Sequence, residues 1–369
     1  MTAKPGTRPI VFLWESFGPS HHDRVRAVAE RGVPVCAIEF AARSIEYDWE
    51  RSEPSGYCLV ALGEPGHRPG SLRLAARLIR AVWRSGARIA FFCHYEQPGV
   101  FLAALVLRLT GRRVFTMADS KFDDYPRAWP RTLAKALFLA PYRGAIAASR
   151  RSREYLAYLG VPRHRIALGF DTLDVARLGS LADKVAETPH RDRPFLVVAR
   201  LIPEKNLSAA LEAFARYRAA SGDTRRLEIV GDGPMRAELA ATAERLGIAD
   251  AVDWRGAQDT AAVARAMRGA LALLLPSIQD TFGLVVIEAF AQGLPVIVSN
   301  RAGACDELAE NLVNAFVVDP LAIGQIVAAM AALAADPARH AAMSAAARSA
   351  AERADARHFA DAVLELEGG

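Results

Sequence analysis

The chain has 369 residues, of which 52% are hydrophobic and 24% charged, with a net charge of +5. This length exceeds the usual size of one hydrophobic core, so we expect two domains of roughly 150 to 200 residues each in an ordinary globular protein. No segment reaches the roughly 18 uninterrupted apolar residues of a membrane span, and the N-terminus lacks the long apolar core of a signal peptide, so we expect a cytoplasmic protein.

Short apolar, β-branched segments alternate with longer helical patterns along the chain, which is typical of parallel βαβ units. The first half contains six predicted strands, at 9–14, 33–40, 57–62, 88–94, 112–119 and 144–149. Residues 173–193 are polar and do not continue the alternation of strand and helix patterns, which predicts a linker between domains.

The alternation restarts after the linker. Strands are predicted at 194–200, 226–231, 251–256, 270–276 and 294–299, and helices at about 206–220, 234–246, 259–268 and around Glu288. Ala-rich helices close the chain, and we expect the last one, at 351–369, to pack back toward the first domain. Two consecutive doubly wound α/β domains leave a cleft at the carboxyl ends of their strands, where such proteins bind ligands.

Two basic residues stand in the loop after the 194–200 strand, Arg200 at the strand end and Lys205 at the start of the next helix. A planar guanidinium and a mobile ammonium together suit the neutralisation of a diphosphate. Taken alone, the pair is equally explained by solvated loop cations.

The segment PSIQDTFGLVVIEAFAQGLPVI, residues 276–297, contains two carboxylates, Asp280 and Glu288. We expect a helix to begin near Phe282, so that its free N–H groups and dipole attract a phosphate, with Gly283 allowing close approach. Asp280 alone reads as a helix cap, and Glu288 alone as a buried, paired carboxylate. Together with Arg200 and Lys205, they favour a nucleotide-sugar site.

Five segments carry a family resemblance. VARLIPEKNLSAALEAF, RLEIVGDGPMRAEL, AVDWRG, LLLPSIQDTFGLVVIEAFAQGLPVIVSNRAG and the following DEL resemble, in this order over residues 194 to about 335, the donor half of the family 4 retaining glycosyltransferases. The resemblance implies the GT-B fold, two Rossmann-like domains facing an interdomain cleft. Residues 1–172 would bind the acceptor, and residues 194–350 would bind an NDP-sugar donor.

The resemblance also implies roles for single residues. Arg200 and Lys205 would hold the donor diphosphate, and the family's E-x7-E pair, here Asp280 and Glu288, would bind the donor sugar and the ribose. This chain has Asp280 where the family usually has Glu. Because Asp is one methylene shorter, Asp280 would contact a differently placed hydroxyl or a different donor sugar. The remaining implied donor-binding residues are Gly18, Gly231, Gly233, Pro234, Thr281, Phe282, Gly283 and Leu284. By itself, the GDGP stretch at 231–234 reads as a tight turn rather than a phosphate cradle.

The first half offers further candidates. ESFGPSHHDRVRAVAERG places Gly18 in a loop that resembles the family's loop between donor and acceptor, and we expect His21 or His22 to be exposed. His94 and Asp119 end the fourth and fifth strands, so we take them as catalytic candidates beside Arg200, Lys205 and Asp280. Lys121 is a weaker candidate.

Residues 1–170 hold 26 Lys and Arg against 14 Asp and Glu, a net charge of +12, so the remainder carries −7. A basic first half indicates either an anionic partner or simply an Arg-rich surface. It contains no stripe of alternating basic and aromatic residues and no motif that is typical of nucleic-acid binding. RTLAKALFLAPYR, residues 131–143, alternates basic and apolar side chains, as either a membrane-surface helix or a helix covering a sheet would.

Cys36, Cys58, Cys93 and Cys305 form no CxxC pair and show no zinc spacing, so we expect reduced, mostly buried thiols. With no DxD motif, we expect neither metal nor cofactor. The sequence therefore predicts a retaining transferase that moves a sugar from an NDP-sugar to a glycan or lipid-linked acceptor, with contact to an anionic membrane left open. A nucleotide-sugar epimerase and an inert nucleotide-sugar-binding subunit are the alternatives.

Overall fold

The computed structural model describes residues 8–41, 54–63, 69–124, 128–182 and 188–368. The chain forms two compact units, the first made of residues 1–174 and 355–369 and the second of residues 175–354. The C-terminal helix α14 (Arg357–Gly368) thus belongs to the first unit, where it packs against α1 (Pro19–Glu30). None of the helices among these described residues is long and apolar enough to cross a bilayer.

The first unit contains a seven-stranded sheet in the order β3-β2-β1-β4-β5-β6-β7, with every neighbouring pair parallel. Its strands are β1 (Ile10–Trp14), β2 (Val35–Glu39), β3 (Cys58–Ala61), β4 (Ile89–Phe92), β5 (Arg113–Ala118), β6 (Ala145–Ala147) and β7 (Ile166–Leu168). The first six coincide with predicted strands. The prediction missed β7, because three residues are too few to establish a periodic pattern.

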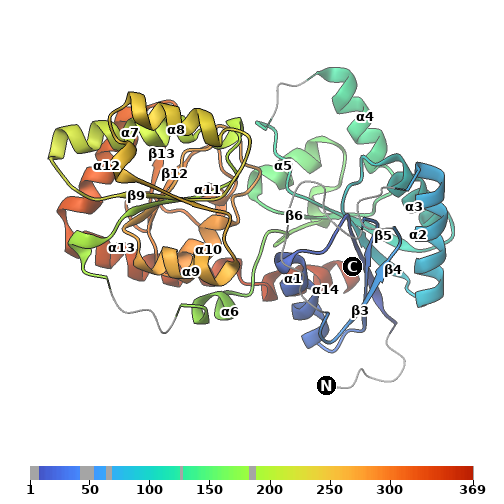
Figure 1. Ribbon diagram of the computed structural model, residues 1–369. Coiled ribbons are helices and arrows are strands. Elements are labelled where there is room, and N and C mark those ends of the chain that lie inside the picture. The colour runs from blue at the N-terminus through green and yellow to red at the C-terminus, as the bar shows by residue number, and fades with distance from the viewer. Residues whose placement is uncertain (1–7, 42–53, 64–68, 125–127, 183–187, 369) are drawn as a thin grey trace. The chain divides into compact units, whose positions relative to one another are not determined.

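Helices cover both faces of this sheet (Figure 1). Besides α1 and α14, they are α2 (Ser71–Ser85), α3 (Pro98–Leu109), α4 (Trp129–Leu139) and α5 (Arg150–Tyr158). Alternation along β1 divides its side chains between the faces: Val11 and Leu13 join the core beneath α2 and α3, whereas Phe12 stacks on Phe91 and meets Phe359 of α14. Burial on both faces explains why the strand reads as a continuous apolar run.

The second unit contains a six-stranded parallel sheet in the order β10-β9-β8-β11-β12-β13. Its strands are β8 (Phe195–Val198), β9 (Leu227–Val230), β10 (Val252–Gly256), β11 (Ala272–Leu275), β12 (Val296–Ser299) and β13 (Ala315–Val318). From β8 the chain builds outward through β9 and β10, then crosses to β11 on the other side. The strand order therefore reverses between β8 and β11, which is where α/β sheets bind ligands.

The helices of the second unit flank its sheet (Figure 1). They are α6 (Val175–Ser180), α7 (Leu207–Ser221), α8 (Arg236–Arg245), α9 (Thr260–Gly269), α10 (Val285–Ala291), α11 (Ala304–Glu307), α12 (Ile323–Ala335) and α13 (Pro337–Ala351). Two features differ from the prediction. The edge strand β13 has no counterpart among the predicted strands, and α10 begins at Val285 rather than near Phe282.

The predicted linker at 173–193 contains α6 and a 3₁₀ turn at His190–Asp192, and its residues 183–187 lie outside the described part of the chain. The expectation of mostly buried cysteines is wrong: Cys93 is buried, Cys36 and Cys305 are half-buried, and Cys58 is exposed. Cys58 stands on the edge strand β3, which has no neighbour on its outer side in the sheet.

Candidate functional site

Four loops meet at the carboxyl edge of the second sheet, around the point where the strand order reverses. They follow β8, β9, β11 and β12, and backbone hydrogen bonds tie them together. These bonds run from the Leu201 N–H to the Asp232 carbonyl (2.9 Å), from the Ile278 N–H to the Glu204 carbonyl (2.9 Å) and from the Ala304 N–H to the Phe282 carbonyl (2.8 Å). The arrangement fixes the positions of most predicted donor-binding residues relative to one another.

Lys205 and Asp280 form an ion pair at this edge. The Lys205 Nζ donates to Asp280 Oδ2 at 2.6 Å, and the Ser277 hydroxyl donates to the same oxygen at 3.2 Å. The two side chains are only 19% and 7% exposed, so the pair lies largely out of solvent. Arg200, at the exposed end of β8, belongs to the same loop as Lys205. The capping interpretation of Asp280 is wrong, because Leu284 occupies the N-cap position of α10 and no side chain caps it.

The loop from Thr281 to Leu284 turns tightly around Gly283. Gly283 has φ +95°, and a Cβ there would lie 3.2 Å from a Leu275 methyl carbon and 3.8 Å from the Asp280 carboxyl carbon. Phe282 is buried, while Thr281 and Leu284 are half-buried. The seven-residue helix α10 begins only at Val285, so residues 280–284 lie outside it.

The GDGP stretch forms a turn pressed against the loop after β8. Gly231 has φ +134° and Gly233 φ +157°, and added Cβ atoms would lie 1.9 Å from the Ala199 carbonyl oxygen and 2.6 Å from the Leu201 carbonyl oxygen. Both glycines are therefore required by the close approach of two backbones. Pro234 is exposed and lies two residues before α8. The close approach of the two backbones favours the tight-turn interpretation of this stretch.

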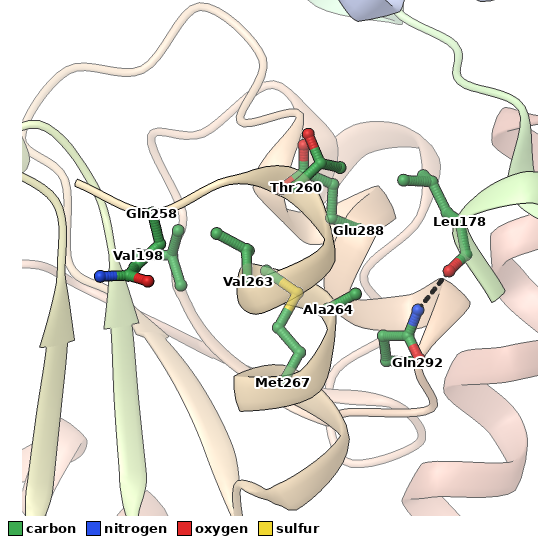
Figure 2. A pocket seen from close by; sticks show the side chains of 9 residues that line it. All are labelled: Leu178, Val198, Gln258, Thr260, Val263, Ala264, Met267, Glu288 and Gln292. Carbon is green, nitrogen blue, oxygen red and sulfur yellow. Dashed lines mark hydrogen bonds between the residues drawn. The ribbon is translucent and has the colours of Figure 1, made fainter. Parts of the chain in front are cut away.

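Glu288 lines a pocket within the second unit, next to Thr260 (Figure 2). The pocket has a volume of about 120 Å³, and its remaining walls come from α6, α9, α10, the end of β8 and the loop before α9. The other lining residues are Leu178, Val198, Gln258, Val263, Ala264, Met267 and Gln292. Glu288 is half-buried, so it is a polar group at the edge of an otherwise mostly apolar hollow rather than a core carboxylate.

In the first unit, Gly18 precedes α1 and is held by His21. The Gly18 N–H donates to His21 Nδ1 at 2.9 Å, so the neutral imidazole carries its proton on Nε2. Burial, followed by the charges of Arg24 and His94, lowers the pKa of His21 well below its usual value. A neutral His21 can keep accepting the Gly18 N–H, which fixes the loop.

The expectation that one of the two adjacent histidines is exposed is wrong. His22 is 2% exposed and its Nδ1 is hydrogen-bonded to the Tyr57 hydroxyl. Its pKa is lowered, first by burial and then by Arg26. No sequence pattern singles out Tyr57, because the contact joins the residue before β3 to α1 through tertiary structure alone.

His94 follows β4 with φ +58°, a conformation uncommon for residues with a side chain. Its ring meets Phe40 edge-on at a centroid distance of 5.7 Å, and its charge contributes to the pKa of His21, so the two histidines are neighbours. Local strain of this kind recurs at functional sites. The structure thus brings His94 near the Gly18 loop.

Asp119 is half-buried after β5, and its carbonyl oxygen accepts a 2.7 Å hydrogen bond from the Ser152 hydroxyl. Lys121 is 1% exposed and pairs with the buried carboxylate of Asp124, while Asp123 lies 3.7 Å away. Lys121 therefore has a structural role, because its ammonium group neutralises a buried carboxylate in the loop after β5.

Comparisons with known proteins place the second unit in a family. The model of the family described as glycosyl transferases group 1 matches residues 182–350. The D-inositol 3-phosphate glycosyltransferase of Segniliparus rotundus is 36% identical over 170 residues, covering 45% of this chain and 38% of that protein. The GDP-mannose-dependent alpha-(1-6)-phosphatidylinositol dimannoside mannosyltransferase of Mycobacterium tuberculosis is 31% identical over 248 residues, covering 65% and 59%.

The matches therefore span less than two thirds of either relative's length. Among solved structures, HepE of Anabaena in complex with UDP aligns with a TM-score of 0.75 over 98% of this chain and 99% of that one, at 16% sequence identity. This likeness establishes the shared fold. Residues 182–350 match the glycosyl transferases group 1 family, and the fold of the chain is GT-B.

Proposed function

We propose that the protein is a retaining glycosyltransferase of polysaccharide or glycoconjugate biosynthesis. It transfers a sugar from a UDP- or GDP-linked donor to a hydroxyl of a glycan or lipid-linked acceptor. The observation that carries the proposal is the Lys205–Asp280 pair beside Arg200, at the reversal point of a sheet within the family-matched segment. UDP in the HepE structure and GDP-mannose in the mycobacterial enzyme's name support the two donor classes.

In the proposed reaction, the negative charge that develops on the departing diphosphate is stabilised by Arg200 and Lys205. An ammonium group has three N–H donors, so Lys205 can keep its bond to Asp280 while donating to a phosphate oxygen. Fixed cations in a largely desolvated site stabilise such charge more strongly than water does. Asp280, oriented by Lys205 and Ser277, accepts from a hydroxyl of the donor sugar with its other oxygen.

The proposed stereochemistry is retention by front-face attack, in which the departing phosphate takes the proton of the acceptor hydroxyl. The proposed chemistry uses no metal and no cofactor besides the donor. Glu288 accepts from the ribose hydroxyls at the rim of its pocket. His94 and Asp119, at strand ends of the first unit, contact the donor sugar or the acceptor.

Helix α4 supports a peripheral contact of the protein with an anionic membrane, at the inner face facing the cytoplasm. Trp129, Leu133 and Leu137 follow one another at helical spacing and are 78%, 54% and 61% exposed. Arg131 and Lys135 stand between them, and α4 contains no acidic residue. An exposed apolar stripe on a helix with basic but no acidic residues suits the interface of a membrane with anionic lipids, where a lipid-linked acceptor would be found.

The proposal is tested by incubating the protein with UDP- and GDP-sugars, with and without a panel of glycan and polyprenyl-diphosphate-linked acceptors. NDP release that requires an acceptor, with a product of unchanged anomeric configuration by NMR, supports retaining transfer. An epimerised sugar formed without acceptor supports the epimerase instead. Binding of an NDP-sugar with no turnover across the panel supports the inert subunit.

A further inference from the structure

Cys36 and Cys58 stand directly opposite each other on neighbouring strands. Cys36 is on β2 and Cys58 on β3, and the parallel register pairs these two residues. Neighbouring strands lie about 4.8 Å apart, which falls within the range of about 4.4 to 6.8 Å between Cα atoms that a disulfide spans. Residues paired in register on neighbouring parallel strands project to the same face of the sheet, so the two thiols lie side by side.

The two thiols differ in access to solvent. Cys58 is exposed on the edge strand, whereas Cys36 is half-buried and packs against the hydrophobic core. Burial, followed by the charge and hydrogen bond of Cys58, raises the pKa of Cys36 to about 11. Two of these three causes disappear once Cys58 has reacted, which makes the Cys36 proton easier to remove at the second step.

We propose that Cys36 and Cys58 form an intramolecular disulfide by exchange with a small-molecule disulfide such as oxidised glutathione. The Cys58 thiolate attacks one sulfur of that disulfide, forming a mixed disulfide and releasing the first thiol. The Cys36 thiolate then attacks the Cys58 sulfur and releases the second thiol, and the two cysteine protons are taken up by the departing thiolates. Two protein thiols are oxidised and one small disulfide is reduced to two thiols.

The bond would secure an edge strand that is weakly buried. All four residues of β3 are exposed or half-buried, so the strand is held mainly by its hydrogen bonds to β2. Tyr57, immediately before Cys58, is bonded to the buried His22 of α1. A covalent link from β3 to the interior strand β2 therefore also holds the residue that anchors α1 beside the Gly18 loop.

The test uses the full chain, incubated with oxidised glutathione at mildly alkaline pH and then quenched with an alkylating agent. Titration under denaturing conditions should show that two of the four thiols have been lost. Peptide mass mapping should find residues 36 and 58 in one cross-linked species without attached glutathione. Dithiothreitol should restore both thiols, and the oxidised protein should melt about 5 °C higher than the reduced protein, because the cross-link restricts the unfolded chain.

Variants separate the two steps. Cys36→Ser should stop the reaction at a stable glutathione adduct on Cys58, and Cys58→Ser should leave Cys36 unmodified. Cys305→Ser, at another half-buried cysteine, should form the bond as the wild type does and serves as the control. The inference is overturned if the wild-type protein keeps glutathione on Cys58 with Cys36 free, if Cys58 links two chains, or if no thiol is consumed.

Discussion

The ammonium nitrogen of Lys205 lies 2.6 Å from a carboxylate oxygen of Asp280, although the two residues are 75 positions apart in the chain. The pair links the loop after β8 to the loop after β11, on the two sides of the point where the strand order reverses. An anion that binds Lys205 must therefore either share the ammonium group with the Asp280 carboxylate or displace that carboxylate. Asp280 therefore has a structural role besides the sugar contact that we propose for it.

Lys205→Ala should weaken the binding of UDP or GDP and also destabilise the protein. A hydrogen bond to a charged group contributes about 1.5 to 3 kcal/mol, so the dissociation constant should rise about 10- to 100-fold. The free energy of unfolding should fall by about 1 to 3 kcal/mol, because the mostly buried Asp280 loses its cation. Isothermal titration calorimetry and urea unfolding measure the two effects separately.

The double variant Lys205→Ala/Asp280→Ala distinguishes the structural role from the binding role. Removing both charges should recover part of the lost stability, because no unpaired carboxylate remains, while nucleotide affinity stays low. If the double variant binds the nucleotide as the wild type does, Lys205 is not a diphosphate ligand.

The interior strands were predictable from the sequence because they are continuous apolar segments buried on both faces of a sheet, as Val11, Phe12 and Leu13 illustrate. The prediction missed β7 and β13, which are short strands at the edges of their sheets. Residues at strand ends, such as Arg200 and His94, could be proposed from position alone.

Contacts between distant side chains could not be proposed in this way. The pairing of Lys205 with Asp280, of His22 with Tyr57 and of Cys36 with Cys58 depends on the order in which the strands lie, which periodicity does not encode. The sequence therefore offered candidate residues at the strand ends, but not the contacts that hold distant side chains together.

Gly231→Ala should destabilise the second unit far more than Gly222→Ala. Both glycines have positive φ, so each alanine is strained by about 1 to 2 kcal/mol. A Cβ at residue 222 has nothing within 4 Å, whereas one at residue 231 would lie 1.9 Å from the Ala199 carbonyl oxygen. Because the Gly231→Ala methyl group must also displace that loop, we expect this substitution to lower the free energy of unfolding by at least about 3 kcal/mol.

Urea unfolding of the two alanine variants checks the difference. Gly231→Ala should also reduce nucleotide binding, because the loop it displaces leads directly into Arg200. Equal stability losses at the two glycines would show that the loops after β8 and β9 do not approach each other closely.

The stability of the second unit should decrease as the pH falls from 6.5 to about 4. Burial, followed by the charges of Arg193 and His190, lowers the pKa of His340 to about 4, and its ring nitrogen Nε2 donates to the Leu271 carbonyl at 3.0 Å. In the unfolded chain a histidine has a pKa near 6.5, so between these values the unfolded state binds the extra proton. The contribution of neutral His340 to the free energy of unfolding is complete above pH 6.5, and it decreases by about 3 kcal/mol as the pH falls to 4.

His340→Gln should remove most of this dependence, because glutamine can still donate to the Leu271 carbonyl but does not titrate. His164→Gln, at an exposed position of the first unit, is the matched control and should leave the dependence unchanged. Urea unfolding at a series of pH values provides the measurement, and an unchanged slope in His340→Gln would assign the acid sensitivity to other groups.

Binding to anionic vesicles should depend on the exposed stripe of α4. Inserting Trp129, Leu133 and Leu137 into the interface buries side chains that contribute about 1.5 to 3 kcal/mol each when fully buried. Leu133→Asp should lower vesicle partitioning at least about tenfold. Leu321→Asp, which replaces a comparably exposed leucine of the second unit, should not change it.

Sedimentation with phosphatidylserine-rich and with phosphatidylcholine vesicles distinguishes the two contributions to membrane binding. Arg131→Gln, at an exposed cation of α4, should reduce binding to the anionic vesicles and weaken its dependence on salt, while leaving the weaker binding to neutral vesicles in place. Leu133→Asp should reduce both, because the apolar contact does not depend on lipid charge. Equal partitioning of the wild type and Leu133→Asp would make α4 an ordinary exposed helix, and the acceptor would then have to reach the protein from solution.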